Sequence, residues 1–149
     1  MKNLLVFLFV LLVFNSFSQL DIKEDKTEEN VIGTYSVVGT TFLKLTEYKT
    51  EEFVSYIFLY KNLKYQQIVD YQSFSLNSMD DVNQLYDVIS KQLPKKEKKD
   101  LEINLPNGDQ LTLSFYKNKS VQFKVWNGSS WSYSTYLRQK QIDKLFGKI

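Results

Sequence analysis

Strict alternation of apolar and polar residues most constrains the fold of this chain. Apolar side chains occupy every second position in residues 101–105, 111–115 and 121–125. The dipeptide Asn107-Gly108 lies between the first two runs and tolerates the positive φ values that a tight hairpin turn requires. Because a period of two places alternate residues on opposite faces of a strand, we expect an antiparallel sheet with one buried face.

Three further strands are predicted before residue 77, since runs rich in β-branched and aromatic residues favour extended structure. They cover residues 31–45, 53–60 and 65–76, and Gly39 within the first run predicts a bulge or a bend. A short run from Trp131 to Leu137 predicts a last strand.

Two segments have the spacing of amphipathic helices. Asn77 or Ser78 suits the cap of the first helix, apolar residues recur at positions 82, 85, 86 and 89, and Pro94 prevents its continuation. The second helix closes the chain, with Ile142, Leu145 and Phe146 on one face. The prediction is therefore an α+β fold: one antiparallel sheet of about six to seven strands in the order βββα-ββββα, with both helices on one face.

Residues 1–18 have the organisation of a cleavable signal peptide. Lys2 supplies a positive start, and the apolar run 4–14 is too short to cross a bilayer. The small residues Ser16 and Ser18 suit a cut after Ser18. The alternative for this segment is an uncleaved N-terminal anchor.

The residues after the cut predict one exported domain. Residues 19–30 are polar and without periodicity, so we expect a flexible leader, and residues 31–149 are long enough for a single hydrophobic core. The chain has no cysteine, and a domain of this size does not need disulfides. We expect a secreted or periplasmic protein with no transmembrane span after cleavage.

The charge of the chain is unevenly distributed. Residues 19–90 contain six lysines and twelve acidic residues, whereas residues 91–149 contain twelve basic and five acidic residues. Such asymmetry can mark a basic surface for an anionic partner. We expect instead that the two halves interleave in the fold and that their charges offset each other. Expected export and a net charge of only +2 argue against nucleic acid as a partner.

Several kinds of chemistry are excluded because the chain has no histidine and no cysteine. This absence rules out catalytic nucleophiles that depend on these residues and the usual zinc and copper sites. It also rules out haem or iron–sulfur ligation by histidine or cysteine. Ser114 and Lys117 match an S-x-x-K motif, but a spacing of three on a strand directs them to opposite faces. We therefore expect no cofactor and no metal, and we assign no catalytic residue.

A binding site is predicted on the open face of the sheet. Trp126 lies out of phase with the buried residues 121–125, so it faces outward beside Lys124, and Tyr116 shares this face. The side on which Trp131 lies depends on the preceding turn. A two- or four-residue turn places both indoles outside, whereas a three-residue turn places Trp131 and Tyr133 inside. We expect the three-residue turn, because it buries large residues and exposes serines. Since the length of the turn leaves the side of Trp131 open, the candidate binding residues are Trp126, Lys124, Tyr116 and Trp131.

The residues favour a non-enzymatic, exported module that binds a protein, a peptide or a carbohydrate through its sheet face. The alternative is a hydrolase that acts on cell-envelope or environmental polymers through a pair of carboxylates. The acidic residues available for such a pair are Glu47, Glu51, Glu52, Asp70 and Glu102.

Overall fold

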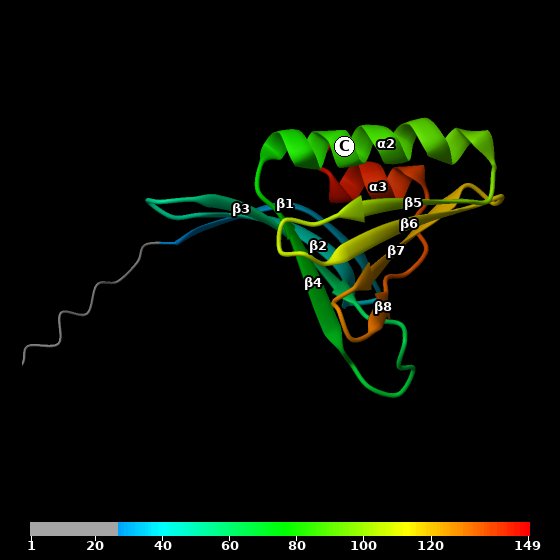
Figure 1. Ribbon diagram of the computed structural model, residues 1–149, viewed down its shortest axis with the longest axis horizontal. Helices are drawn as coiled ribbons and strands as arrows, with labels where there is room; N and C mark the ends of the chain where they lie inside the picture. The colour runs from blue at the N-terminus through cyan, green and yellow to red at the C-terminus, as the bar shows by residue number, and fades with distance from the viewer. Residues whose placement is uncertain (1–26) are drawn as a thin grey trace, which may run out of the picture.

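Two four-stranded antiparallel sheets and two helices make up the computed structural model, which describes residues 27–149 (Figure 1). The first sheet contains β1 (Glu28–Val37), β2 (Thr40–Lys49), β3 (Val54–Lys61) and β4 (Tyr71–Leu76) in chain order. Helix α2 (Met79–Gln92) and the 3₁₀ turn η2 (Leu93–Lys95) follow. The second sheet contains β5 (Lys99–Asn104), β6 (Gln110–Tyr116), β7 (Ser120–Trp126) and β8 (Trp131–Tyr133), and helix α3 (Gln139–Leu145) closes the fold. The predicted signal peptide, residues 1–18, lies outside the described residues.

The predicted α+β class is confirmed, but the strands form two sheets of four instead of one sheet of six to seven. The additional strand comes from the first apolar run, which contains a complete hairpin. Val38 and Gly39 have φ values of 46° and 77°, as a two-residue hairpin turn requires. Valine rarely adopts positive φ, so the sequence around Gly39 predicts a bend and not a reversal of the chain.

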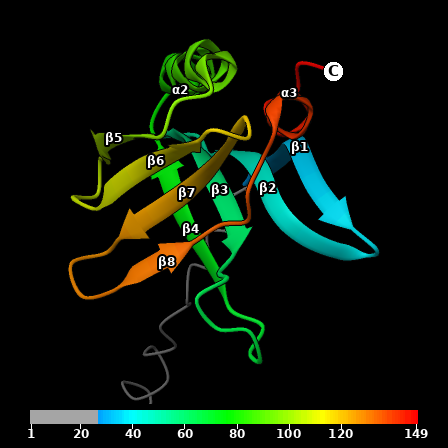
Figure 2. The ribbon, with the colours of Figure 1, turned by 90° about the vertical axis from the view of Figure 1, so that its right-hand side faces the viewer.

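The two sheets are joined where β8 meets the end of β3 (Figure 2). The backbone N–H of Leu63 donates to the carbonyl of Tyr133 at 2.8 Å, and the N–H of Tyr133 donates to Oδ1 of Asn62 at 3.0 Å. Asn62 is buried, and its amide nitrogen donates to Asp70 at 2.8 Å. A single buried amide therefore connects the two sheets and the loop before β4.

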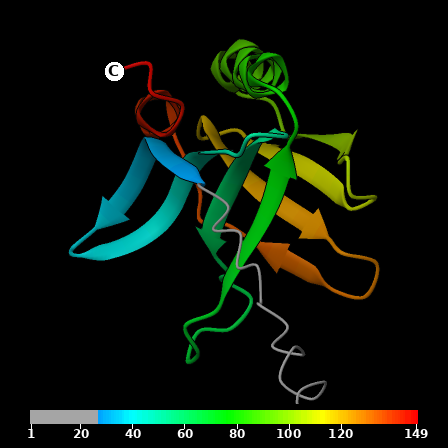
Figure 3. The same cartoon turned by 90° about the vertical axis from the view of Figure 1, so that its left-hand side faces the viewer.

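Both helices lie on the same side of the two sheets (Figure 3). Ser78 caps α2 by accepting a hydrogen bond from the backbone N–H of Asp81 at 3.1 Å. The predicted buried faces of the helices, which include Val82, Leu85 and Ile89 in α2, are buried in the core. Within residues 27–149, neither helix combines the length and the apolar character needed to cross a membrane.

Phe58 lies at the centre of one continuous core. Its ring stacks on Phe74 at 4.7 Å between centroids, and it also contacts Phe123 at 6.5 Å and Phe146 at 5.5 Å. These partners belong to β4, to β7 and to the end of α3, so one side chain connects both sheets with a helix.

Strand β1 passes close under helix α3 at Gly33. A Cβ atom at this position would lie 2.2 Å from the carbonyl oxygen of Lys144 and 2.3 Å from that of Leu145. Only glycine permits this approach of a strand to a helix backbone.

We expect the protein to lose stability steeply above pH 10. Burial raises the pKa of Tyr60 to about 12, while an unfolded chain would ionise this phenol near its ordinary value of 10. The unfolded state therefore releases its proton first as pH rises. The contribution of neutral Tyr60 is complete below pH 10 and declines by about 1 kcal/mol for each pH unit up to pH 12.

Urea denaturation at pH 8 and pH 11 tests this expectation. Tyr60→Phe removes the hydrogen bond to Ser132 and lowers stability at pH 8, but its decline towards pH 11 should be shallower than that of the unmodified protein. Equal declines in both proteins would show that Tyr60 does not govern the alkaline transition.

Candidate functional site

The outer face of the second sheet, turned away from the core, carries the candidate site. Residues that pair across strands share a face, so the register of the sheet defines its members. They form two cross-strand rows. The first row contains Asn104, Gln110, Trp126 and Trp131, and the second contains Glu102, Thr112, Lys124 and Tyr133. Gln122 and Tyr116 lie beyond the second row.

Two tryptophans form the most prominent feature of this face. Trp126 ends β7 and pairs directly with Trp131, the first residue of β8. Their ring centroids are 5.5 Å apart and the planes are inclined by 45°. Both indoles are half-buried, so each presents part of its ring to solvent. These are the only tryptophans in the chain.

A rigid four-residue turn holds the two indoles together. Oδ1 of Asn127 accepts hydrogen bonds from the backbone N–H of Ser129 at 3.1 Å and of Ser130 at 2.9 Å. Gly128 has a φ of 87°, which glycine adopts without strain. The predicted three-residue turn is therefore wrong. Side-chain hydrogen bonding by Asn127 favours the longer turn, and Ser132 faces the core instead of Trp131.

Lys124 lies two residues before Trp126 on the same face, about 7 Å along the strand. It is half-buried, and it pairs with Tyr133 on one side and with Thr112 on the other. The hydroxyls of Thr112 and Ser114 are buried and have no hydrogen-bond partner within residues 27–149. Buried hydroxyls without a partner are uncommon. Thr112 pairs directly with Lys124, and Ser114 pairs with Gln122.

Tyr116 occupies the other end of the same face, about 20 Å from the indoles along the strands. Its ring meets Tyr136 edge to face at 5.1 Å, and its hydroxyl donates to Gln122 at 3.3 Å. Burial, followed by the neighbouring Tyr136, raises the pKa of Tyr116. This phenol remains neutral at physiological pH and acts as a hydrogen-bonding group.

The structure thus brings three of the four predicted residues together and separates the fourth. Trp126, Trp131 and Lys124 form one cluster, whereas Tyr116 belongs to a second cluster with Tyr136. Tyr133 joins the first cluster and is absent from the predicted site. A turn with an even number of residues places Trp131 on the outer face. Tyr133, two positions further along the strand, then lies on that face as well, so the length of the turn would have indicated it.

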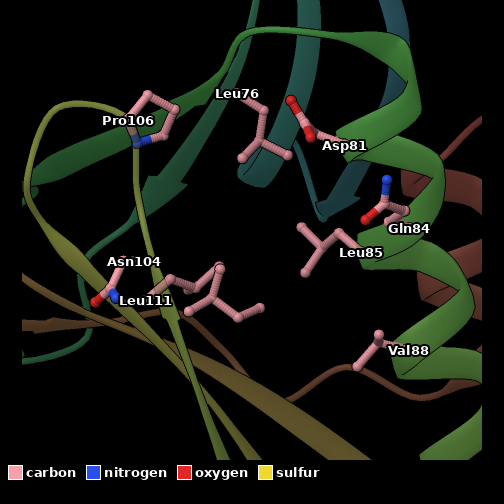
Figure 4. A pocket seen from close by; sticks show the side chains of 9 residues that line it. Leu76, Asp81, Gln84, Leu85, Val88, Asn104, Pro106 and Leu111 are labelled. Atoms are coloured by element: carbon pink, nitrogen blue, oxygen red, sulfur yellow. The ribbon is translucent and has the colours of Figure 1, made fainter.

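A groove of about 300 Å³ lies between α2 and the β5–β6 hairpin (Figure 4). Its walls are mainly apolar, with Leu85 and Val88 of α2 facing Leu111 of β6. Asp81 is the one carboxylate in its lining, and it accepts a hydrogen bond from the capping Ser78 at 2.7 Å. This carboxylate serves the start of the helix.

The acidic residues available for a hydrolase lie in the β2–β3 hairpin, in the loop before β4 and in β5. Glu47 accepts from Tyr56 at 2.9 Å, Asp70 from Asn62 at 2.8 Å, and Glu102 from Gln110 at 3.2 Å. Glu51 and Glu52 are exposed in the turn between β2 and β3. No cluster of three or more potential metal ligands occurs in the part of the chain that the structure describes.

Comparison of the chain with family models, with curated proteins and with solved structures finds no match.

Proposed function

We propose that this protein is an exported, non-enzymatic module that binds a carbohydrate through the outer face of its second sheet. The observation that carries the proposal is the pair of half-buried indoles, Trp126 and Trp131, beside Lys124. Indole rings offer flat apolar surfaces with a polar N–H at one edge, which suits the faces and hydroxyls of a sugar ring.

The surroundings of the indoles supply polar groups for the hydroxyls of a sugar. Asn104 and Gln110 continue the cross-strand row of the two indoles, and Glu102 and Tyr133 continue the row of Lys124. Strands and a hydrogen-bonded turn hold these side chains, so little ordering is required when a ligand binds.

The carboxylate-based hydrolase is the weaker proposal. A retaining or inverting glycosidase needs two carboxyl groups about 5–10 Å apart across the scissile bond. The groove beside α2 offers Asp81 alone, and that carboxylate accepts a hydrogen bond from the capping Ser78. Glu47, Asp70 and Glu102 each hold a neighbouring side chain by a hydrogen bond.

Intrinsic tryptophan fluorescence tests the proposal, because the only two tryptophans lie in the site. We expect at least one member of a panel of cellotetraose, xylotetraose, maltotetraose and chitotetraose to change the emission in a saturable way. Trp126→Ala should weaken binding of that sugar at least tenfold, about 1.4 kcal/mol, and lower the unfolding temperature only slightly. Binding by the variants is measured by isothermal titration calorimetry.

Tyr65→Ala is the matched control, since Tyr65 is a well-exposed aromatic residue in the loop between β3 and β4. This variant should bind as the unmodified protein does. A fall of several degrees in the unfolding temperature of Trp126→Ala would identify Trp126 as a core residue. An unchanged affinity in Trp126→Ala, or no response to any sugar of the panel, would remove the proposed carbohydrate site.

A further inference from the structure

A second concave site lies at the other end of β7, away from the indoles. An open pocket of about 430 Å³ lies between η2, the turn between β6 and β7, and the start of α3. We call it the basic pocket, and its lining residues are Leu93, Pro94, Asn118, Lys119, Arg138, Gln139 and Lys140. Its volume lies in the range of small-molecule sites.

Three cations and no carboxylate line the basic pocket. Within residues 27–149, the side chains of Lys119, Arg138 and Lys140 form no ion pair, and the one salt bridge there joins Lys44 to Glu29. Lys95 and Lys117 are adjacent in sequence to lining residues and add positive charge. An uncompensated cluster of this kind attracts anions.

The basic pocket belongs to a segregation of charge across the fold. The turn between β6 and β7 and the C-terminal end of α2 lie at one end of the molecule (Figure 1). The turn between β2 and β3 and the first turn of α2, which carry Glu51, Glu52, Asp80 and Asp81, lie at the other end.

The kinds of residue in the basic pocket indicate a phosphate group. Arg138 is the only arginine in the chain, and its planar guanidinium can donate two parallel hydrogen bonds to phosphate oxygens. Oδ1 of Asn118 accepts from Ser120 at 2.6 Å, which leaves its amide N–H groups to donate. Three positive charges match a phosphate monoester of about −1.5 to −2 better than a carboxylate of −1.

Lys119 has a strained backbone conformation at the rim of the basic pocket. Its φ is 59°, a left-handed conformation at the end of a three-residue hairpin loop, where glycine is usual. A lysine at this position strains the backbone, yet it places a cation at the rim of the basic pocket.

We propose that the basic pocket binds the phosphate group of a phosphorylated small molecule, such as a sugar phosphate. The proposal concerns a site separate from the indole pair and does not rest on carbohydrate binding there. Leu93, which is buried, and Pro94, which is exposed, form an apolar wall for the body of such a ligand.

Isothermal titration calorimetry with glucose 6-phosphate, inorganic phosphate, glucuronate and glucose tests this proposal. We expect glucose 6-phosphate to bind at least tenfold more tightly than glucuronate, and glucose to show no binding. Arg138→Gln should weaken binding of glucose 6-phosphate at least tenfold. Lys49→Gln, which removes the same charge from an exposed position at the end of β2, should leave it unchanged.

Lys119→Gly separates ligand binding from stability. It should weaken glucose 6-phosphate binding several-fold and at the same time raise the unfolding temperature by a few degrees, because glycine relieves the left-handed strain. A merely structural role for Lys119 would move stability without moving affinity.

Other outcomes have defined meanings. Binding of inorganic phosphate with the same dependence on Arg138 supports phosphate recognition without a contribution from the sugar. Equal losses in Arg138→Gln and Lys49→Gln would overturn the proposal in favour of nonspecific charge attraction. Absence of binding to both glucose 6-phosphate and inorganic phosphate would also overturn it.

Discussion

Replacing Gly33 by alanine is expected to destabilise the protein by about 3 kcal/mol, the upper end of the range for overpacking. The added methyl group would lie 2.2 Å from the carbonyl oxygen of Lys144 and 2.3 Å from that of Leu145. Both are backbone atoms of α3, so no side chain can rotate away and the helix itself has to shift. Since α3 buries Ile142 and Leu145 in the core, its displacement loosens the packing of β1 and β2. Urea denaturation followed by circular dichroism measures the loss.

Gly128→Ala provides the control for this effect. Gly128 has a φ of 87°, and a Cβ there would meet no atom within 4 Å. Its replacement should cost only the strain of the left-handed conformation, about 1–2 kcal/mol. If the two variants lost equal stability, contact with α3 would not explain why glycine is needed at position 33.

Truncation of Phe58 to alanine should cost about 3–5 kcal/mol, as for other large aromatic residues in close-packed cores. Phe58 is fully buried and contacts three further rings, which belong to β4, to β7 and to the end of α3. The cavity would therefore open where both sheets and a helix meet. The free energy of unfolding at 25 °C, measured by urea denaturation, gives the result.

Phe53→Ala tests whether the loss of stability in Phe58→Ala comes from the buried position of the ring and not from the loss of a phenylalanine as such. Phe53 precedes β3 and is 60 % exposed, so its truncation should change stability by less than about 0.5 kcal/mol. A loss below 2 kcal/mol in Phe58→Ala would mean that the surrounding rings close the cavity and that the core is more adaptable than its packing suggests.

Local patterns predicted the second sheet better than the first. The alternation between residues 101 and 125 and the cap at Ser78 depend on neighbours in sequence, and both features are present. The hairpin at Val38 is absent from the prediction because valine there adopts a backbone conformation that it usually avoids. The junction between the two sheets depends on Asn62, whose partner Tyr133 is 71 residues away. No local pattern reveals such a contact.

Local sequence patterns also predicted only part of the candidate sites. Trp126 could be placed on the outer face because it lies out of phase with its own strand. The position of Trp131 required the length of a turn that the side chain of Asn127 determines. The basic pocket was not predicted as a site, since η2, the turn at Lys119 and the start of α3 meet only in the folded chain.

The junction between the sheets also bears on the order of events during folding. Tyr60 and Ser132, which are hydrogen-bonded across it, are separated by 72 positions. Closing so long a loop is entropically costly, and folds dominated by distant pairings form slowly. A nascent chain that lacks β8 and α3 has neither the second half of this junction nor the partner of β1 at Gly33. Stable tertiary structure is therefore expected only once β8 and α3 are available to pack against the first sheet.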